Sequence, residues 1–299
     1  MALKLLRDGF TADSNASVSL ANKVVLITGG TRGIGRAIAL RCARDGACVA
    51  VLSRSASTSN ICAQIAAAGG RSLALDCDIR SDDQVASAVA LTVSEFGGID
   101  ILVNNATTLV LKRTLELDMA EYDLMASTNT RGAFAATKHA LQHLAKSTNA
   151  HVLTLCPQPQ LEQRWFERNL AYTMSKFSMG LMAFGLAAEQ RANGIASNAL
   201  WPFTTIDTDG LAECRNADLQ ARPRTPTIMA DAAHAIVCRP AAEFTGNFCL
   251  DEVVLREAGV MDFDVYSAVP GTPLDDLSRD HLVSKEQLAR LNELRASHS

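Results

Sequence analysis

The sequence lacks two features that would place a protein in a membrane or on nucleic acid. No stretch of about 18 apolar residues is free of charged residues, so we expect no membrane-spanning helix. Lysine and arginine form no block along the chain, and the formal net charge is −4, so we expect no nucleic-acid partner. The chain also contains no internal repeat and no low-complexity tract.

A third absence concerns cysteine and metal chemistry. The eight cysteines show no C-x-x-C spacing and are scattered through the chain, at Cys42, Cys48, Cys62, Cys77, Cys156, Cys214, Cys238 and Cys249. This pattern predicts reduced thiols and a cytoplasmic protein rather than a disulfide framework. His139 and His143 have the i, i+4 spacing that could hold a metal ion. Because no acidic or cysteine residue lies near them in the sequence, we expect a solvated helix face there and no metal site.

The two ends of the chain differ from its middle. Residues 1–20 begin with a faintly amphipathic run that is too short for a signal peptide, and we interpret them as an N-terminal extension. Residues 21–269 show no break in composition, and 48% of the chain is hydrophobic, which predicts one domain with a large core. Residues 270–299 form a tail that is partly helical, from about 284 to 295, and that we expect to pack on the body or on a neighbouring subunit.

Short β-rich runs alternate with longer helical stretches along the middle of the chain. The expected strands cover residues 23–28, 48–52, 71–75, 99–103, 151–155, 196–200 and 247–250. The expected helices cover residues 32–44, 59–68, 82–96, 119–146, 171–191 and 226–237. This alternation predicts an α/β fold with one doubly wound parallel sheet covered by helices on both faces. In such a sheet the ligand crevice lies at the carboxyl ends of the strands.

A glycine-rich loop follows the first expected strand and opens the first expected helix. Gly29 permits a tight turn, Gly33 lets the backbone approach a pyrophosphate, and Gly35 allows close packing of helix on strand. The helix N-terminus then presents free N–H groups and a favourable dipole to the phosphates. The loop predicts dinucleotide binding and also contains Thr31, Arg32 and Ile34.

The end of the second expected strand indicates which dinucleotide is preferred. NAD-binding proteins place an acidic residue here to bind the ribose hydroxyls, and this chain has none. Ser53 and Arg54 suit a 2′-phosphate instead, and Arg32 could supply a second cation. We therefore expect NADP(H) to be preferred and NAD(H) to remain possible. The alternative is that Arg54 is only a solvated turn residue.

Polar residues also follow the next two expected strands. Asp78, which precedes Ile79, could accept a hydrogen bond from the adenine amine. Asn104, Asn105 and Ala106 lie at the end of the fourth strand. Asparagine also caps strand ends through bonds from its side chain to the backbone, so a purely structural role remains open.

Three residues have the character of an acid/base set. Tyr172 and Lys176 are four residues apart, which on a helix places them on one face. An ammonium group near a phenol favours the phenolate, so this pair can exchange a proton at working pH. Asn129 is a poor helix former within an otherwise apolar helical stretch, a conflict that indicates either a function or a capped kink.

These motifs together resemble the short-chain dehydrogenase/reductase family over roughly residues 20 to 265. The resemblance implies a Rossmann-type fold with Tyr172 as the acid/base, Lys176 on the nicotinamide ribose and Asn129 in a water relay. It implies that Asp78, Ile79, Asn105 and Ala106 contact the adenosine half of the cofactor. It also implies that Pro202, Thr204 and Ile206 contact the carboxamide and phosphates, and that the protein is a homodimer or homotetramer. A narrower likeness to one subgroup, with lipophilic substrates, rests on the stretches around Trp165, Trp201, Met229 and Phe244.

The chain departs from the family where a catalytic serine is usual. The corresponding segment reads Leu155-Cys156-Pro157-Gln158-Pro159. The usual spacing from the tyrosine places the serine position at Pro159, whereas alignment by the strand end places it at Cys156 or Pro157. A thiol is a weak donor and proline donates no hydrogen bond. Loss of one oxyanion donor costs about 10²–10³ in rate, unless Gln158 or Gln160 replaces it. Phe203 stands where relatives have glycine, and with Trp165 it predicts an apolar substrate side or aromatic core packing.

The sequence therefore predicts an NADP(H)-dependent oxidoreductase that transfers a hydride between nicotinamide and a carbonyl or secondary alcohol of a lipophilic substrate. Two alternatives stay open. The chain could be a cofactor-binding scaffold or subunit with impaired catalysis, which the altered serine position favours. It could also be an epimerase or dehydratase, because fold does not fix function.

Overall fold

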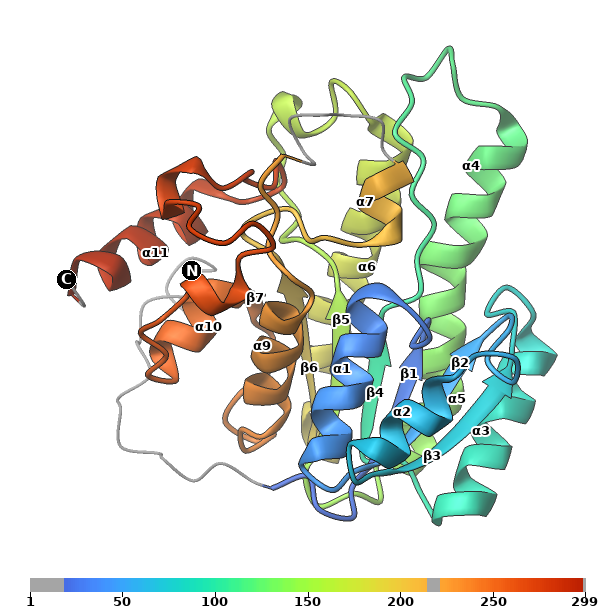
Figure 1. The fold of residues 1–299 in the computed structure, drawn as a ribbon. Coiled ribbons are helices and arrows are strands. Elements are labelled where there is room, and N and C mark those ends of the chain that lie inside the picture. The colour runs from blue at the N-terminus through green and yellow to red at the C-terminus, as the bar shows by residue number, and fades with distance from the viewer. Residues whose placement is uncertain (1–18, 214–220, 298–299) are drawn as a thin grey trace.

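The computed structural model describes residues 19–213 and 221–297, and its centre is a seven-stranded sheet in which all neighbouring strands are parallel (Figure 1). The strand order is β3-β2-β1-β4-β5-β6-β7. The strands are β1 Val24–Thr28, β2 Cys48–Ser53, β3 Arg71–Asp76, β4 Ile101–Asn104, β5 Ala150–Leu155, β6 Ile195–Trp201 and β7 Phe248–Leu250. The order reverses between β1 and β4, which places a ligand crevice at the carboxyl ends of these strands. The predicted doubly wound sheet is confirmed.

Helices cover both faces of the sheet because the central strands are apolar on both sides. Val25 and Ile27 of β1 face one core cluster and Leu26 faces the other, as the two-residue period of a strand requires. On the first face lie α1 Gly33–Arg44, α2 Ile61–Ala67, α9 Thr227–Val237 and α10 Asp251–Glu257. On the second face lie α3 Asp82–Phe96, α5 Ala133–Leu144 and α6 Leu170–Glu189. The shorter helices α4 Met119–Met125 and α7 Asp209–Glu213 lie toward the carboxyl ends of the strands (Figure 1).

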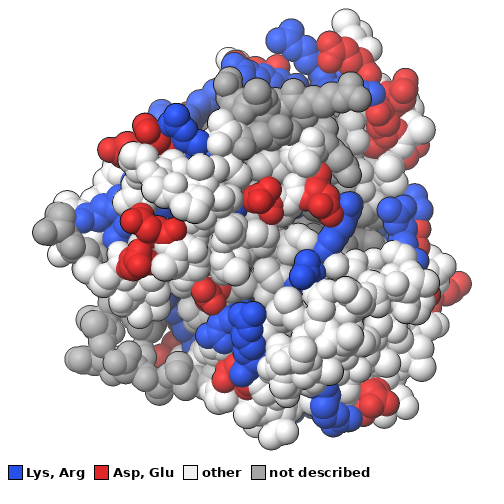
Figure 2. Space-filling model, viewed as in Figure 1, with Lys and Arg blue, Asp and Glu red and all other residues white. Residues whose placement is uncertain are grey.

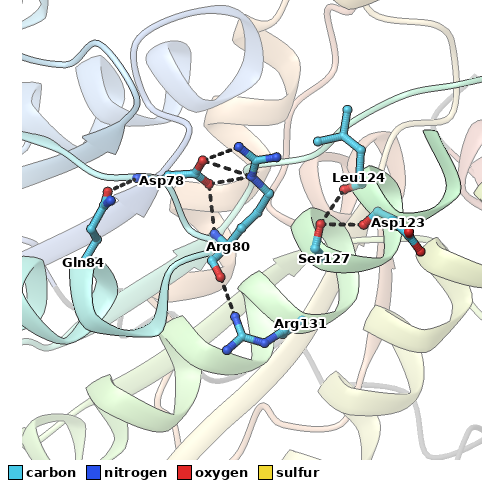
Figure 3. Close-up of polar contacts among 7 residues, drawn as sticks. All are labelled: Asp78, Arg80, Gln84, Asp123, Leu124, Ser127 and Arg131. Atoms are coloured by element: carbon cyan, nitrogen blue, oxygen red, sulfur yellow. Dashed lines mark hydrogen bonds and ion pairs between the residues drawn. The ribbon is translucent and has the colours of Figure 1, made fainter. Parts of the chain in front are cut away.

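The helix expected over residues 119–146 is wrong in one respect, because it is interrupted. A π-helical turn, η2 Ala126–Gly132, separates α4 from α5. Its sequence, Ala-Ser-Thr-Asn-Thr-Arg-Gly, contains poor helix formers, and Ser127 Oγ bonds back to the carbonyls of Asp123 and Leu124 (Figure 3). A Cβ on Gly132 would stand 2.7 Å from Ile79 Cδ1, so glycine permits the close approach of this turn to the β3–α3 connection.

The C-terminal tail packs along the end of β6. The backbone N–H of Thr205 donates to Ser278 O at 2.8 Å, and that of Asp280 donates to Phe203 O at 3.0 Å. The tail ends in helix α11 Lys285–Ser297, whose Leu291 is buried against Phe203 and Leu250. The tail therefore contacts the segment after β6 that the family resemblance predicts to lie beside a cofactor.

Arginines surround one buried glutamate where the tail meets the body. Glu252 of α10 lies 2.8 Å from Arg224 Nη1, and it accepts hydrogen bonds from Arg256 at 2.9 Å and Arg295 at 2.8 Å. Burial opposes ionisation of Glu252, but the hydrogen bond from Arg295 and the charge of Arg224 outweigh it and lower its pKa to about 2. This cluster joins three segments that are far apart in the sequence.

On the face seen in Figure 2, acidic and basic side chains are interspersed.

None of the described helices combines the length and apolar character needed to cross a membrane. The described cysteines form no disulfide. Cys214 and residues 1–18 of the expected N-terminal extension lie outside the described part of the chain.

Candidate active site

The glycine loop has the geometry of a phosphate-binding turn. Gly29 has φ +69 and Gly33 has φ +54, values that favour glycine. A Cβ on Gly35 would stand 2.4 Å from both Gly29 O and Asn105 Nδ2, so no larger residue fits without a shift. In the described structure α1 has no capping side chain and no acidic residue in its first turn, which leaves its N-terminus suited to an anion. These features fit a bound dinucleotide.

Asn105 braces this loop from the neighbouring strand. Its Nδ2 donates to Thr28 O at 3.0 Å and to Gly29 O at 2.9 Å. Thr28 Oγ1 accepts from the backbone N–H groups of Asn105 and Ala106, both at 3.1 Å. The asparagine expected to touch the adenosine therefore also fixes the loop that would hold the phosphates.

The residues expected near the ribose gather at the end of β2. Thr31 Oγ1 donates to Ser53 Oγ at 3.3 Å, which ties the glycine loop to this strand end. Arg54 makes no ion pair within the described residues, although its charge helps to lower the pKa of Asp78. Arg32 lies 3.5 Å from Asp209 of α7, and both side chains are about two-thirds exposed, so this pair contributes little to stability.

Asp78 is held by a network that Figure 3 shows. Its carboxylate accepts hydrogen bonds from the Arg80 guanidinium, which lower its pKa, and its backbone N–H donates to Gln84 Oε1 at 2.8 Å. Arg131 of η2 donates to Arg80 O. The network connects Asp78 to the π-helical turn that carries Asn129.

Asn129 is fully buried and uses both ends of its amide. Oδ1 accepts from Thr108 N at 2.7 Å and from Thr107 Oγ1 at 3.0 Å. Nδ2 donates to Thr108 O at 3.0 Å and to Ser175 Oγ at 2.9 Å. The side chain therefore joins the loop after β4 to α6, next to Lys176. A poor helix former is therefore tolerated at this position, because the wider π turn lets the Asn129 side chain bond to residues outside its own helix.

Lys176 is buried on α6 and points to the end of β5. Its Nζ donates to Leu155 O at 2.8 Å and lies 5.3 Å from the centre of the Trp201 ring. Burial lowers the pKa of Lys176 to about 8, although the nearby Asp280 charge partly opposes this. An ammonium group in this setting loses its proton far more readily than one in water.

Tyr172 lies one turn before Lys176 in a mainly aromatic and apolar cluster. Only 7% of the residue is exposed, and its cluster includes Trp165, Trp201 and Met125. Thr173 Oγ1 donates to Trp165 O at 2.8 Å, which fixes the segment before the helix against its first turn. The phenol thus lies in a setting that limits access of water.

The segment at the usual serine position is placed by α6. A Cβ on Gly180 would stand 2.8 Å from Pro159 Cγ and 2.9 Å from Pro157 O, so glycine lets this segment lie directly on the helix. The Cys156 thiol is buried in a cluster with Met179 and Ala199, and burial raises its pKa to about 12. Gln158 Oε1 accepts from Ser284 Oγ of the tail at 3.1 Å.

The aromatic residues expected on the substrate side have different surroundings. Phe203 is 1% exposed and packs with Leu250 and Leu291, so it serves at least in part as core packing. Trp201 Nε1 donates to Asp280 Oδ1 at 2.9 Å. Pro202, Thr204 and Ile206 are buried at the end of β6. Thr204 Oγ1 has no hydrogen-bond partner in the described structure, so it could accept or donate a bond to a cofactor.

Two histidines lie beside carboxylates that could share a metal ion with them. His139 Nε2 lies 3.0 Å from Asp82 Oδ1, a pairing the sequence spacing did not reveal. The ligand atoms of Asp45, His234 and Cys238 lie within 4.8 Å of one another. Because Asp45 Oδ2 accepts from Leu20 N and lies 2.9 Å from His234 Nε2, we assign this group to holding α1, α9 and the chain before β1 together.

Sequence reasoning missed the contribution of the tail to the site. Asp280 anchors Trp201 and Ser284 anchors Gln158, across separations of 79 and 126 residues. Neither residue belongs to a motif, and no periodic pattern relates them to the strands. The sequence indicated only that the tail, residues 270–299, packs on the body or on a neighbouring subunit.

Comparison with known proteins gives one family. A profile described as short chain dehydrogenase matches residues 23–218. Hydroxysteroid dehydrogenase-like protein 2 from Xenopus tropicalis is 43% identical over 263 residues, which is 85% of this chain and 63% of that protein. The human protein of the same name is 40% identical over 263 residues, 85% of this chain and 62% of that protein. The chain thus spans less than two thirds of the length of these relatives.

Solved structures give the same result. A protein described as a dehydrogenase from Xanthomonas campestris has a TM-score of 0.85 and 45% identity, covering 90% of this chain and 100% of its own. A short chain dehydrogenase from Mycobacterium thermoresistibile has a TM-score of 0.82 and 42% identity, covering 89% and 96%. A short chain dehydrogenase from Burkholderia cenocepacia, solved in complex with NADP, has a TM-score of 0.70 and 29% identity, covering 78% and 97%.

Proposed function

The chain belongs to the short-chain dehydrogenase family, and we propose that it is an NAD(P)-dependent oxidoreductase. In this proposal it uses NADP(H) to interconvert a carbonyl and a secondary alcohol on a lipophilic substrate. The observation that carries this proposal is the buried pair of Tyr172 and Lys176 on one face of α6. The bound nicotinamide would supply or take up the hydride. The protein's own residues would handle the proton and hold the reactants.

Tyr172 carries the proton in this proposal. In reduction its hydroxyl gives a proton to the substrate oxygen, and in oxidation its phenolate takes the proton from the alcohol. The Lys176 ammonium favours the phenolate through its charge, and this charge acts strongly because the group is buried. Asn129 positions Ser175 and the loop after β4, so we propose that it supports the proton relay to Lys176.

Arg54 supports the preference for NADP(H). It is exposed at the end of β2, is paired with no carboxylate within the described residues, and has Ser53 beside it. A 2′-phosphate there would gain a charge-assisted hydrogen bond. The phosphate groups themselves would be held by Gly29, Gly33 and the N-terminus of α1.

Gln158 is the proposed substitute for the usual serine. Its Oε1 accepts a hydrogen bond from Ser284 Oγ, so the two N–H donors on Nε2 are the end available to a substrate oxygen. Cys156 is less suited, because its thiol is buried and donates toward Thr154 O at 3.7 Å. Pro202, Thr204 and Ile206 are proposed to contact the carboxamide and phosphates of the cofactor.

Enzyme and NADPH incubated with a panel of medium-chain aldehydes and ketones test this function. We expect NADPH-dependent reduction that Tyr172→Phe lowers by at least about a hundredfold while NADPH still binds. Tyr122→Phe, in α4, is the matched control and should keep the wild-type rate. Equal rates in wild type and Tyr172→Phe would overturn the assignment.

A second candidate function rests on Cys156. With a buried thiol and two prolines at the serine position, the chain could bind the dinucleotide as a scaffold or subunit without efficient catalysis. This candidate predicts NADPH binding by calorimetry, no turnover on the panel, and no gain of activity in Cys156→Ser.

We also propose that the protein is a homodimer or homotetramer in the cytoplasm. The supporting observation is a set of exposed apolar side chains on α5 and α6, namely Phe134, Leu181 and Phe184. Sedimentation at micromolar concentration tests the assembly, and a monomer there would contradict it.

A further inference from the structure

A cavity of about 570 Å³ lies between the segment before α6 and the C-terminal tail. Its apolar lining includes Leu111, Trp165, Phe203, Val283 and Leu288. The volume is in the range of cavities that hold small organic ligands. An apolar chain or ring system would bury its surface there.

The same cavity has a basic rim. Arg164, Arg168 and Arg279 line it, together with the acidic residues Glu167 and Asp280. Asp280 is engaged internally, because its Oδ1 accepts from Trp201 Nε1 at 2.9 Å and from Leu282 N at 2.8 Å.

Two of these arginines have charge to offer a ligand. Arg279 makes no ion pair within residues 19–213 and 221–297, and its guanidinium lies 5.8 Å from the centre of the Phe203 ring. Arg168 is 3.7 Å from its neighbour Glu167, with 79% of its side chain exposed, which is a weak pairing. Arg164 is more firmly held, at 2.8 Å from Glu162 and stacked on Trp165.

Two residues of the cavity wall connect it to the neighbourhood of the reacting residues. Trp165 lines it and packs in the same cluster as Tyr172. Asp280 lines it and binds Trp201, whose ring lies 5.3 Å from Lys176 Nζ. Neither Tyr172 nor Lys176 lines the cavity, so these two wall residues are what link a ligand there to the reacting pair.

We propose that this cavity binds a substrate with an apolar body and an anionic headgroup, a carboxylate or a phosphate, which Arg168 and Arg279 hold at the rim. The inference deepens the proposed function, on which it rests, by naming the substrate class. A guanidinium is suited to this task because its planar fork matches the geometry of both anions. Neutral substrates of the same length would fill the cavity but would offer no anion to Arg168 and Arg279.

Binding of unreactive ligands tests this separately from turnover. Decanoate, decyl phosphate and neutral methyl decanoate are titrated by calorimetry into protein saturated with NADP⁺, so that the cofactor's own phosphate site is filled. We expect one or both anions to bind at least about tenfold more tightly than the ester. Arg168→Gln and Arg279→Gln should each remove most of this preference and leave ester binding unchanged. Arg290→Gln on α11, which does not line the cavity, should retain it.

The outcomes separate the headgroup from the reaction. A preference for decanoate alone or decyl phosphate alone identifies a carboxylate or a phosphate substrate. Equal binding of ester and anions, or an anion preference that survives both rim substitutions, overturns the proposal even if ketones are reduced. Anion-selective binding without any turnover would support the cavity assignment while the proposed oxidoreductase activity fails.

Discussion

At the scale of single residues, the central feature is a lysine whose charge depends on its burial. Lys176 is 2% exposed, and its ammonium group is held by Leu155 O. Most lysines keep their proton throughout the range of enzyme assays, whereas burial lowers the pKa of Lys176 to about 8. The acidity of the Tyr172 phenol therefore depends on whether Lys176 carries its proton, and burial brings the pKa of Lys176 into the assay range.

This predicts a pH dependence of activity. Burial lowers the pKa of Lys176 to about 8, so the ammonium loses its proton above that pH. The charge then no longer stabilises the phenolate that forms when Tyr172 gives its proton to the substrate. We expect kcat/KM for NADPH-dependent reduction to fall as pH rises through about 8. Lys176→Arg keeps its charge at all assay pH values, so it should lower the rate but remove that fall. An unchanged basic limb in the arginine variant would contradict this origin.

Arg54 gives a prediction about cofactor choice. Arg54→Gln removes the proposed partner of the 2′-phosphate, so the KM for NADPH should rise about tenfold to a hundredfold while that for NADH stays within twofold. Arg36→Gln on α1, which is bonded to Gln64, is the control. Comparable losses with both cofactors would show that Arg54 does not read the phosphate.

At the scale of elements, a π-helical turn and a glycine within α6 position the site. The π turn η2 lets Asn129 reach the loop after β4 and Ser175 at once. Helix α6 carries Gly180 in its middle, at a cost in helix propensity, and the proline segment lies on it. The π turn and the helix glycine both contact segments next to the proposed proton relay, where such local conflicts are expected.

Gly180→Ala tests whether the proline segment is held by α6. Its Cβ would stand 2.8 Å from Pro159 Cγ and would push the segment away. We expect kcat to fall about tenfold or more, with a loss of about 1–3 kcal/mol in the free energy of unfolding. Gly185→Ala on the same helix meets no atom within 4 Å and should instead stabilise by up to about 1 kcal/mol. Equal kcat values for Gly180→Ala and Gly185→Ala would show that contact between α6 and the proline segment does not affect catalysis.

The elements most open to prediction were those that a short stretch of sequence determines. The strands follow from apolar runs, and the phosphate turn follows from Gly29, Gly33 and Gly35 between a strand and a helix. Helix α10 was not expected, because Asp251–Glu257 follows β7 without a loop and is too short for a clear helical period. The contacts of Asp280 and Ser284 depend on where the tail comes to lie, which no local pattern encodes.

At the scale of the whole molecule, buried charges join the tail to the sheet. Glu252 binds Arg256 of its own helix, and Arg224 and Arg295 from two other segments. The adjacent Asp251 is fully buried, and its Oδ1 accepts from Phe203 N at 2.9 Å. Because removal of one partner of a buried pair leaves an uncompensated charge, this cluster makes the position of α11 specific.

The cluster predicts how stability depends on pH. Burial raises the pKa of Asp251 to about 6, despite the nearby Arg224 charge, from 3.8 for the exposed group. The folded state therefore binds this proton more tightly than the unfolded state does. The resulting contribution to the free energy of unfolding is complete below about pH 4 and is lost as pH rises through about 6. Asp251→Asn should remove this part of the dependence, worth on the order of 3 kcal/mol. Urea unfolding from pH 4 to 7 measures it, and parallel curves for the two proteins would contradict it.

The proposed function requires hydride transfer assisted by Tyr172, and isotopic labelling measures this transfer directly. The enzyme is incubated with NADPH that carries two deuterium atoms at C4, and product alcohols from the carbonyl panel are analysed by mass spectrometry. We predict one deuterium on the former carbonyl carbon with the wild-type enzyme, and at least about a hundredfold less labelled product with Tyr172→Phe, at similar affinity for NADPH. Tight NADPH binding with no labelled product from any carbonyl, or equal labelling by both proteins, would contradict it.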